Sequence, residues 1–193
     1  MEYKKFAEFL LNAKKLLEKE NNIRNLKRRV YISILIIQLS NGLRISEAVE
    51  CMSKFSQDLK RLQYVRVRKM KKRDKIVLRE CRVPEIITER DAELYKILFA
   101  NKPQKHIENS VKLMLWYNFK IKSHDLRKAY INYMIKKDAI AVLETLKFQD
   151  HKNLIYYIED AVEKAKVYMK IKDYLNKKTV AEDAVDELFR KVF

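Results

Sequence analysis

Apolar residues recur at helical spacing along most of the chain. In residues 3–20, Phe6 and Leu10 begin an apolar stripe whose opposite face carries Lys and Glu, and this period predicts an amphipathic helix. Residues 24–39 start with basic side chains and are then almost wholly apolar, as in a helix whose second half lies in a core. The same spacing predicts helices at about 3–20, 24–39, 46–52, 89–100, 106–119, 124–136, 138–148, 154–175 and 179–190.

One stretch between the helices favours strands instead. Residues 64–67 and 76–78 are rich in β-prone side chains, and a turn of Lys, Arg and Asp at 69–75 separates them, which predicts a β-hairpin. One glycine and two prolines exclude collagen, flexible linkers and a turn-rich all-β protein. The predicted fold class is therefore mainly α with a small antiparallel β-hairpin or sheet.

The net charge indicates the class of partner. Lys and Arg number 43 against 26 Asp and Glu, which gives a formal net charge of +17. A folded chain of this charge usually binds a polyanion such as DNA or RNA, or an anionic membrane surface. The hairpin is its most basic part, since between Lys60 and Lys75 only Asp74 is acidic, and we expect phosphate contacts there. No helix sets a basic face against a broad aromatic one, which argues against a membrane surface.

Cysteine use and apolar length indicate the compartment. The longest apolar stretch, Val30 to Leu39, has about half the length that a bilayer needs, and the N-terminus lacks the layout of a signal peptide. Cys51 and Cys81 form no CxxC pair and the three histidines form no HxxxH pair, so we expect reduced thiols and no metal site. These features predict a cytoplasmic protein. Low Gly and high Lys and Ile content suggest an archaeal or viral source, in the latter case with the host cytoplasm as the compartment.

The first candidate site is the turn at residues 41–47. Gly42, the single glycine, is a normal helix stop, and Ser46 is the expected N-cap of the next helix. The turn carries Arg44, whose guanidinium group can fork onto phosphate oxygens. The alternative is an ordinary ion pair between Arg44 and a nearby carboxylate such as Glu47.

The second candidate site is the helix start at residues 123–128. Ser123 is its expected N-cap, and His124 and Arg127 are three residues apart, hence on one helical face. We expect this face to be exposed and to present a cation and a proton-transfer group to an anion at a helix N-terminus. The alternative is that both side chains are ordinary exposed residues that bind no ligand.

The third candidate site is a helix break followed by tyrosines. His151 lies at the break, and Tyr156 and Tyr157 come within two turns of it. Tyrosines in such a place are normally part of a core or its rim. They gain chemical interest if a phosphate site lies opposite them, because a phenol is a possible nucleophile.

The order of these features resembles the tyrosine recombinase (phage integrase) family. Residues 42–47 look like its first arginine box, residues 124–127 look like its His-x-Leu-Arg box, and His151 stands where its second histidine is expected. The basic hairpin falls between the boxes, where the family carries its catalytic lysine. The chain is similar to both Xer-type and archaeal fusellovirus-type integrases. The resemblance implies the tyrosine recombinase catalytic-domain fold, with an N-terminal helix at 1–22, the catalytic domain at 23–176 and a C-terminal helix or tail at 177–193.

The sequence departs from the family at the nucleophile and the lysine. Family members commonly place the nucleophile about nine or ten residues after the histidine or its replacement, whereas Tyr156 and Tyr157 follow His151 by five and six. A shorter connecting turn would restore either one. The fusellovirus-type pattern favours Tyr157 and the Xer-type pattern favours Tyr156, and Tyr168 is a weaker third candidate. For the lysine we favour Lys71, then Lys69.

The resemblance implies DNA strand cleavage and rejoining through a 3′-phosphotyrosyl link, without metal or cofactor. Arg44 and Arg127 would hold the non-bridging phosphate oxygens, and His124 would help to accept the tyrosine proton. The hairpin lysine would protonate the leaving 5′-oxygen, and His151 would donate a hydrogen bond to the phosphate. The side chains expected to contact the DNA backbone are Arg66, Arg68, Lys72, Arg73, Lys128 and Lys152.

The implied partner is double-stranded DNA, bound by a homo-tetramer on paired sites. The form expected free in solution is a monomer. The apolar stripe at the end of the chain docks either on a neighbouring protomer or on its own domain. The resemblance leaves integration, excision and resolution open. A different hypothesis is a catalytically degenerate, recombinase-like DNA-binding protein that kept the basic cleft and lost the nucleophile.

Overall fold

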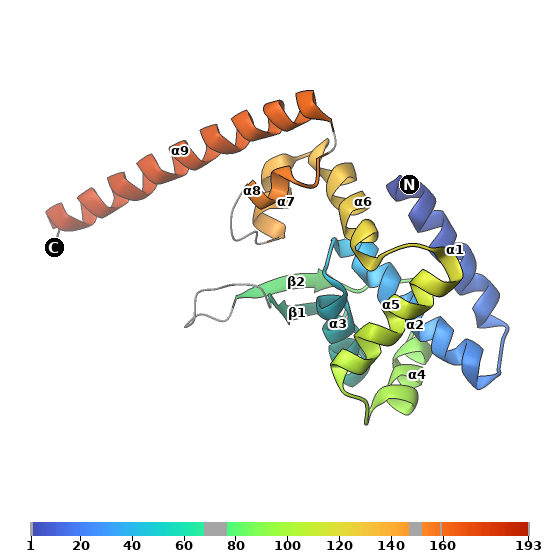
Figure 1. Ribbon diagram of the computed structural model, residues 1–193. Coiled ribbons are helices and arrows are strands. Elements are labelled where there is room, and N and C mark those ends of the chain that lie inside the picture. Colours follow the sequence, from blue (N-terminus) through green and yellow to red (C-terminus); the bar gives the residue numbers. More distant parts are fainter. Residues whose placement is uncertain (1, 68–76, 147–151, 159, 193) are drawn as a thin grey trace. The chain divides into compact units, whose positions relative to one another are not determined.

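The computed structural model describes residues 2–67, 77–146, 152–158 and 160–192. The chain folds into two compact units, Met1–Tyr133 and Met134–Phe193. The fold is mainly helical with a two-stranded antiparallel sheet, which confirms the predicted class (Figure 1). The elements of the first unit are α1 (Tyr3–Glu18), α2 (Ile23–Asn41), α3 (Ile45–Asp58), β1 (Leu62–Arg66), β2 (Leu78–Arg82), α4 (Glu89–Phe99), α5 (Gln104–Phe119) and the greater part of α6 (Ser123–Ile135).

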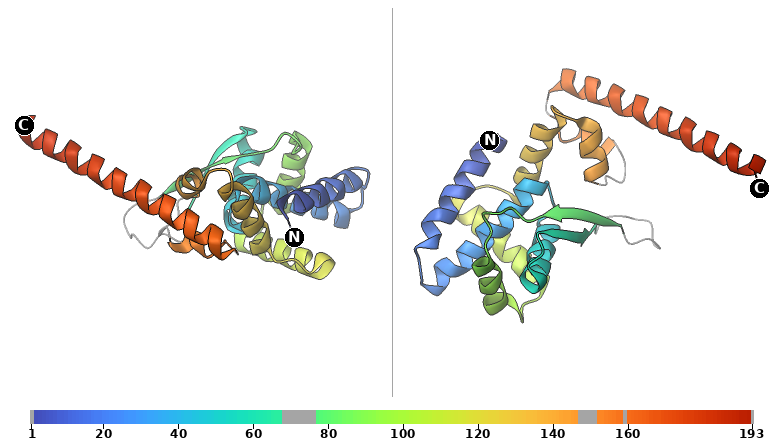
Figure 2. Two further views of the ribbon diagram at one scale, coloured as in Figure 1. Left: turned by 90° about the horizontal axis from the view of Figure 1, so that it is seen from above. Right: turned by 180° about the vertical axis from the view of Figure 1, so that it is seen from behind.

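Helix α2 is the central element of the first unit. The side chains of Val30 and of residues 32–39 are buried, as its apolar second half predicts. Figures 1 and 2 show α1, α3, α4 and α5 around it. At its end Gly42 takes the left-handed conformation, with φ 60°, so the predicted helix stop is confirmed.

A buried ion network joins α1, α2 and α4. Lys14 Nζ and Arg29 Nε each lie 2.7 Å from a carboxylate oxygen of Asp91, and all three side chains are buried. Burial raises the pKa of Asp91, but Lys14, the backbone N–H of Thr88 and Arg29 together hold this pKa below its ordinary value. The carboxylate is therefore ionised, and it neutralises one of the two buried cations.

The sheet pairs Leu62 with Arg82 at one end and Arg66 with Leu78 at the other. Helix side chains contact the outward backbone groups of both strands. On β1, Lys54 Nζ donates to the Tyr64 carbonyl at 2.5 Å, and the Arg66 N–H donates to Glu50 Oε1 at 3.1 Å. On β2, the Asn41 amide group accepts from the Arg82 N–H and donates to the Arg82 carbonyl, both at 2.9 Å. The sheet is thus held by α3 on one edge and by the end of α2 on the other.

The second unit contains the end of α6 together with α7 (Ala139–Thr145), α8 (Lys152–Ile155) and α9 (Ala161–Val192). Its buried apolar side chains include Val142, Leu154 and Val167. Within this unit α9 continues as one long helix past α7 and α8 (Figure 2). The predicted pair of helices at 154–175 and 179–190 is therefore wrong, because no residue between them interrupts a helix.

Two helix starts also differ from the prediction. The N-cap of α3 is Arg44 rather than Ser46, because Glu47 Oε2 accepts the Arg44 N–H at 2.9 Å. Ser123 is the first residue of α6 rather than its cap, since Asp125 Oδ2 accepts the Lys122 N–H at 2.9 Å. In both places a carboxylate three residues into the helix sets the boundary. Helix α3 also extends to Asp58, beyond its predicted end at 52.

The expectation of reduced thiols is wrong. Cys51 on α3 and Cys81 on β2 form a disulfide, with Cα atoms 6.7 Å apart. Both residues are buried. The two cysteines are thirty residues apart in the sequence, and this spacing does not indicate that α3 and β2 pack against each other. The sequence therefore suggested free thiols.

Within the described residues no single helix is long and apolar enough to cross a membrane, whereas α2 and α3, bent by 113° at their junction, pass the same test as a pair.

Candidate functional site

Arg44 lies in the tight turn between α2 and α3. Its Nη1 atom is 3.0 Å from Glu47 Oε1 and its side chain is 30% exposed. The alternative weighed from the sequence, an ion pair with Glu47, is therefore confirmed. The pairing does not consume the guanidinium group, which carries five N–H donors and remains partly open to solvent.

Glu47 has a second cationic partner that sequence reasoning missed. Arg79 Nη1 on β2 lies 2.6 Å from Glu47 Oε2, and both side chains are buried. Residues of β2 alternate between exposed and buried, and Arg79 takes an inward position. A charged residue at an inward strand position was the signal available in the sequence, but recognising it requires the strand boundaries.

Helix α6 is tied to the same turn by hydrogen bonds. Arg127 Nη1 donates to the Gly42 carbonyl at 2.5 Å, across 85 residues of sequence. Gln38 Nε2 donates to the carbonyls of Ser123 at 2.8 Å and Leu43 at 3.3 Å. These contacts place the second candidate motif directly beside the first.

Arg127 itself corrects an expectation. Its side chain is 1% exposed, so it does not share an exposed face with His124. The start of α6 is inserted against the α2–α3 turn, and Leu126 and Ala129 are buried together with Arg127. A guanidinium group that stays ionised when buried gives this turn a fixed positive charge.

His124 lies within the electrostatic reach of these cations. Partial burial, followed by the charge of Arg127, lowers the pKa of His124 below its ordinary value. Asp125 opposes this shift, whereas Arg44 and Lys128 also lower the pKa. The structure therefore brings together Arg44, His124 and Arg127. An imidazole whose pKa is lowered in this way is neutral at pH 7 and able to accept a proton.

The structure describes only some of the other residues predicted to contact DNA or to act in catalysis. Arg66, at the end of β1, is exposed. Lys152 is part of α8, with only its backbone described. The predicted site residues that lie outside the described ranges are Arg68, Lys69, Lys71, Lys72, Arg73 and His151.

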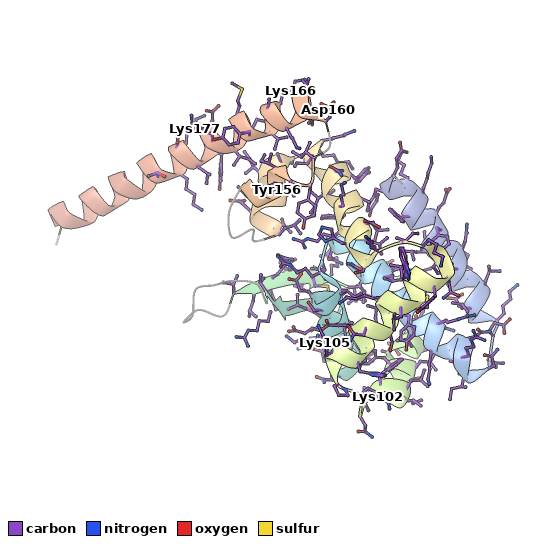
Figure 3. All side chains as sticks on the ribbon, viewed as in Figure 1. Lys102, Lys105, Tyr156, Asp160, Lys166 and Lys177 are labelled. Atoms are coloured by element: carbon purple, nitrogen blue, oxygen red, sulfur yellow. A yellow bond between two sulfur atoms is a disulfide. The ribbon has the colours of Figure 1, made fainter. Side chains whose placement is uncertain are left out.

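The two candidate nucleophiles belong to the second unit. Tyr156 follows α8 directly, and its side chain is 81% exposed (Figure 3). The Tyr157 N–H donates to the Leu154 carbonyl at 3.0 Å, and its side chain is half-buried. Tyr156 thus presents an accessible phenol to solvent.

Comparison with known proteins finds an archaeal relative. The chain is 30% identical over 176 residues to an uncharacterized protein, MJ0770, of Methanocaldococcus jannaschii, and the match covers 80% of this chain and 76% of MJ0770. The chain belongs to the family of MJ0770. No family model matches the chain, and no solved structure matches it.

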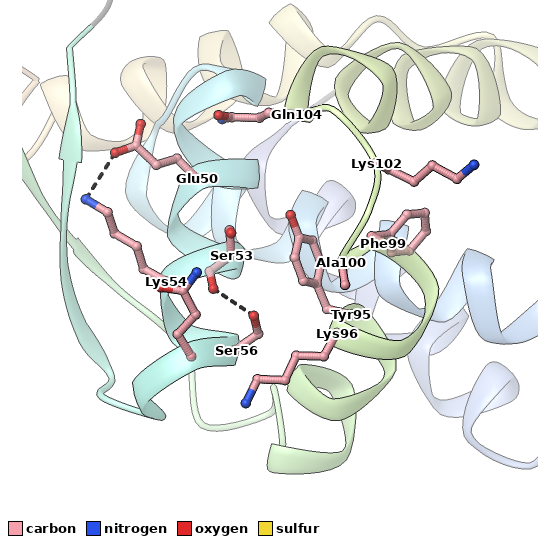
Figure 4. A pocket seen from close by; sticks show the side chains of 11 residues that line it. Glu50, Ser53, Lys54, Ser56, Tyr95, Lys96, Phe99, Ala100, Lys102 and Gln104 are labelled. Carbon is pink, nitrogen blue, oxygen red and sulfur yellow. Dashed lines mark hydrogen bonds and ion pairs between the residues drawn. The ribbon is translucent and has the colours of Figure 1, made fainter.

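A separate cavity of about 410 Å³ lies between α3, α4 and the start of α5 (Figure 4). Its polar lining includes Tyr95, whose pKa burial raises. The Lys54–Glu50 ion pair, with 3.1 Å between Nζ and Oε1, lies at its edge. None of Arg44, His124 and Arg127 lines it, so it is distinct from the cationic turn. Among the described side chains no three His, Cys, Asp or Glu residues gather to hold a metal ion.

Proposed function

We propose that the protein is a tyrosine-type, site-specific DNA recombinase whose catalytic part has the tyrosine recombinase fold. The observation that carries this proposal is the meeting of the two arginine motifs at one turn. Arg127 bonds to the Gly42 carbonyl, two residues before Arg44, and His124 lies in the field of both arginines. This combination suits a phosphodiester, whose negative charge grows in the transition state.

In the proposed reaction a tyrosine oxygen attacks the scissile phosphorus. A P–O bond to tyrosine forms and the P–O5′ bond breaks, which leaves a 3′-phosphotyrosyl link and a 5′-hydroxyl. Arg44 and Arg127 stabilise the non-bridging oxygens, and neutral His124 accepts the tyrosine proton, since a phenol with a pKa near 10 needs a base at neutral pH. The hairpin lysine, Lys71 or Lys69, supplies a proton to the 5′-oxygen. Attack by a 5′-hydroxyl then reverses the step, so the energy of the phosphodiester bond is conserved.

The net charge of +17 supports double-stranded DNA as the partner. We propose a homo-tetramer on paired sites and a cytoplasmic location. The rival function, binding without cleavage, is favoured by one observation, the short spacing of five and six residues from His151 to Tyr156 and Tyr157.

A nicked suicide substrate tests the proposal. A pool of duplexes and a four-way junction are incubated with the wild type, Tyr156→Phe and Tyr157→Phe, and covalent adducts are resolved on a denaturing gel. Tyr117→Phe is the matched control, since Tyr117 is 70% exposed in the first unit and is not a candidate nucleophile. We expect an adduct band that one of the two candidate substitutions abolishes and the control keeps. Absence of a band for every protein, together with tight salt-sensitive binding, would establish the rival function.

A further inference from the structure

Glu47 is a fully buried carboxylate shared by two arginines. Arg44 Nη1 is 3.0 Å from one of its oxygens and Arg79 Nη1 is 2.6 Å from the other. The two cations differ in access, because Arg79 is 1% exposed whereas Arg44 is 30% exposed. The group as a whole carries one positive charge, and this charge is accessible only through Arg44.

Arg79 is fixed in place by contacts on the same strand. Cys81, two residues along β2, is bonded to Cys51, one helical turn beyond Glu47 on α3. Four residues of helix rise about 6 Å and two residues of strand rise about 6.6 Å, so the ion pair and the disulfide form two matched links between α3 and β2. The paired backbone bonds of Arg82 to Asn41 hold the strand to α2 as well.

A carboxylate in a buried position holds an arginine most strongly when it accepts from both prongs of the guanidinium group. With Arg79 absent, the buried carboxylate of Glu47 would keep Arg44 as the cation that neutralises it. Both oxygens of Glu47 would then draw Arg44 inward and reduce the donors that it offers to solvent.

We infer that Arg79 is a positioning residue for Arg44. By taking one oxygen of Glu47, Arg79 neutralises the carboxylate and leaves the outer donors of Arg44 available to a DNA phosphate. This inference rests on the proposed function for the identity of the phosphate, and it deepens that function by adding a residue outside the two motifs.

The first measurement concerns binding alone. The affinity for a nonspecific fluorescent duplex is measured against salt concentration for the wild type, Arg79→Met, Arg44→Ala and the double variant. If Arg79 acts through Arg44, each single change lowers the slope of log K against log salt by roughly one, and the double variant shows no further loss. Arg82→Met removes the same charge from an exposed position of the same strand, and its effect is expected to add to that of Arg44→Ala.

The second measurement uses the covalent reaction. Arg79→Met is expected to slow adduct formation roughly 100- to 1000-fold, the range for a lost oxyanion donor. Adding Glu47→Gln is expected to restore part of the rate, because no buried charge then competes for Arg44. An ion pair with a merely structural role would instead give additive binding losses and no recovery, and either result overturns the inference.

A second variant distinguishes a folding defect from the loss of the positioning role of Arg79. If Arg79→Met does not fold, the neutral pair Arg79→Met with Glu47→Gln replaces it, since exchanging a whole buried ion pair is often tolerated. This pair is then expected to bind DNA with the wild-type salt slope, and a slope lowered by one overturns the inference. Failure of the wild type to form an adduct contradicts the proposed function alone, because the binding comparison still decides the role of Arg79.

Discussion

Replacing Gly42 with alanine tests how the turn that carries Arg44 is built. An added Cβ would lie 2.2 Å from Cδ1 and 2.5 Å from Cε1 of Tyr130. These distances are far below van der Waals contact, so the ring or the turn must move. The residue also has φ 60°, a conformation that disfavours any side chain.

The magnitude follows from three contributions. An L-residue in the left-handed region costs about 1–2 kcal/mol, and overpacking of a well-packed site costs about 1–3 kcal/mol. Alanine also stiffens the unfolded chain, which returns about 0.4–1 kcal/mol. The expected loss in the free energy of unfolding is therefore about 3 kcal/mol for Gly42→Ala.

Urea unfolding followed by tryptophan fluorescence measures this loss. The single tryptophan, Trp116, lies in α5 of the same unit, so its signal reports the unit that contains the turn. Leu59→Gly is the control for conformation, because Leu59 caps α3 with φ 55° and glycine should relieve that strain. Tyr130→Ala isolates the clash, since Gly42→Ala in its background should lose only the conformational share, about 1 kcal/mol.

Two results would refute this reasoning. The first is a loss below about 1 kcal/mol for Gly42→Ala, which would mean that the turn yields without strain. The second is an equal loss with and without the Tyr130 ring, which would exclude the clash as a cause.

Other contacts lead to three further expectations. Changing Cys51 and Cys81 to serine should lower the free energy of unfolding by about 3–4 kcal/mol for a loop of thirty residues; a reductant should shift the melting temperature of the wild type but not of this variant. Asp91→Asn should cost about 3–5 kcal/mol because it removes the buried carboxylate that Lys14 and Arg29 share; a urea midpoint close to that of the wild type would contradict this. His124 has a lowered pKa, so the unfolded chain binds its proton more readily and stability should fall as pH decreases through about 6.5. Urea midpoints between pH 7.5 and 5.5 should show a steeper decline for the wild type than for His124→Gln.

The sequence predicted the elements of the fold better than their ends. Period and composition were sufficient for most of the helices and for an antiparallel strand pair because these follow from apolar faces. They were not sufficient for the long helix α9, and the strands are Leu62–Arg66 and Leu78–Arg82 rather than 64–67 and 76–78. Gly42 marked a helix end through its own backbone freedom. The starts of α3 and α6 were displaced because Glu47 and Asp125 reach back to a preceding N–H. The boundary depends on whether a carboxylate three residues into the helix accepts the N–H of the capping residue. Helix propensity does not include this hydrogen bond.

The sequence predicted which residues form the candidate site better than it predicted their burial and their partners. Arg44, His124 and Arg127 were named from two motifs, and the structure brings them together. The burial of Arg127 and the presence of Arg79 depend on which strand and which turn cover them, and a single sequence does not contain that information. The disulfide was missed for the same reason, since it joins elements whose contact arises only in the tertiary fold.

The side chains that bind the outward backbone groups of the sheet have a consequence for self-association. A two-stranded sheet exposes an open edge on each side, and such edges recruit strands from other molecules. Here Lys54 binds the Tyr64 carbonyl, Glu50 binds the Arg66 N–H, and Asn41 binds Arg82 as a neighbouring strand would. At these positions an incoming strand finds its hydrogen-bonding partners already engaged, so these parts of both edges resist edge-to-edge pairing.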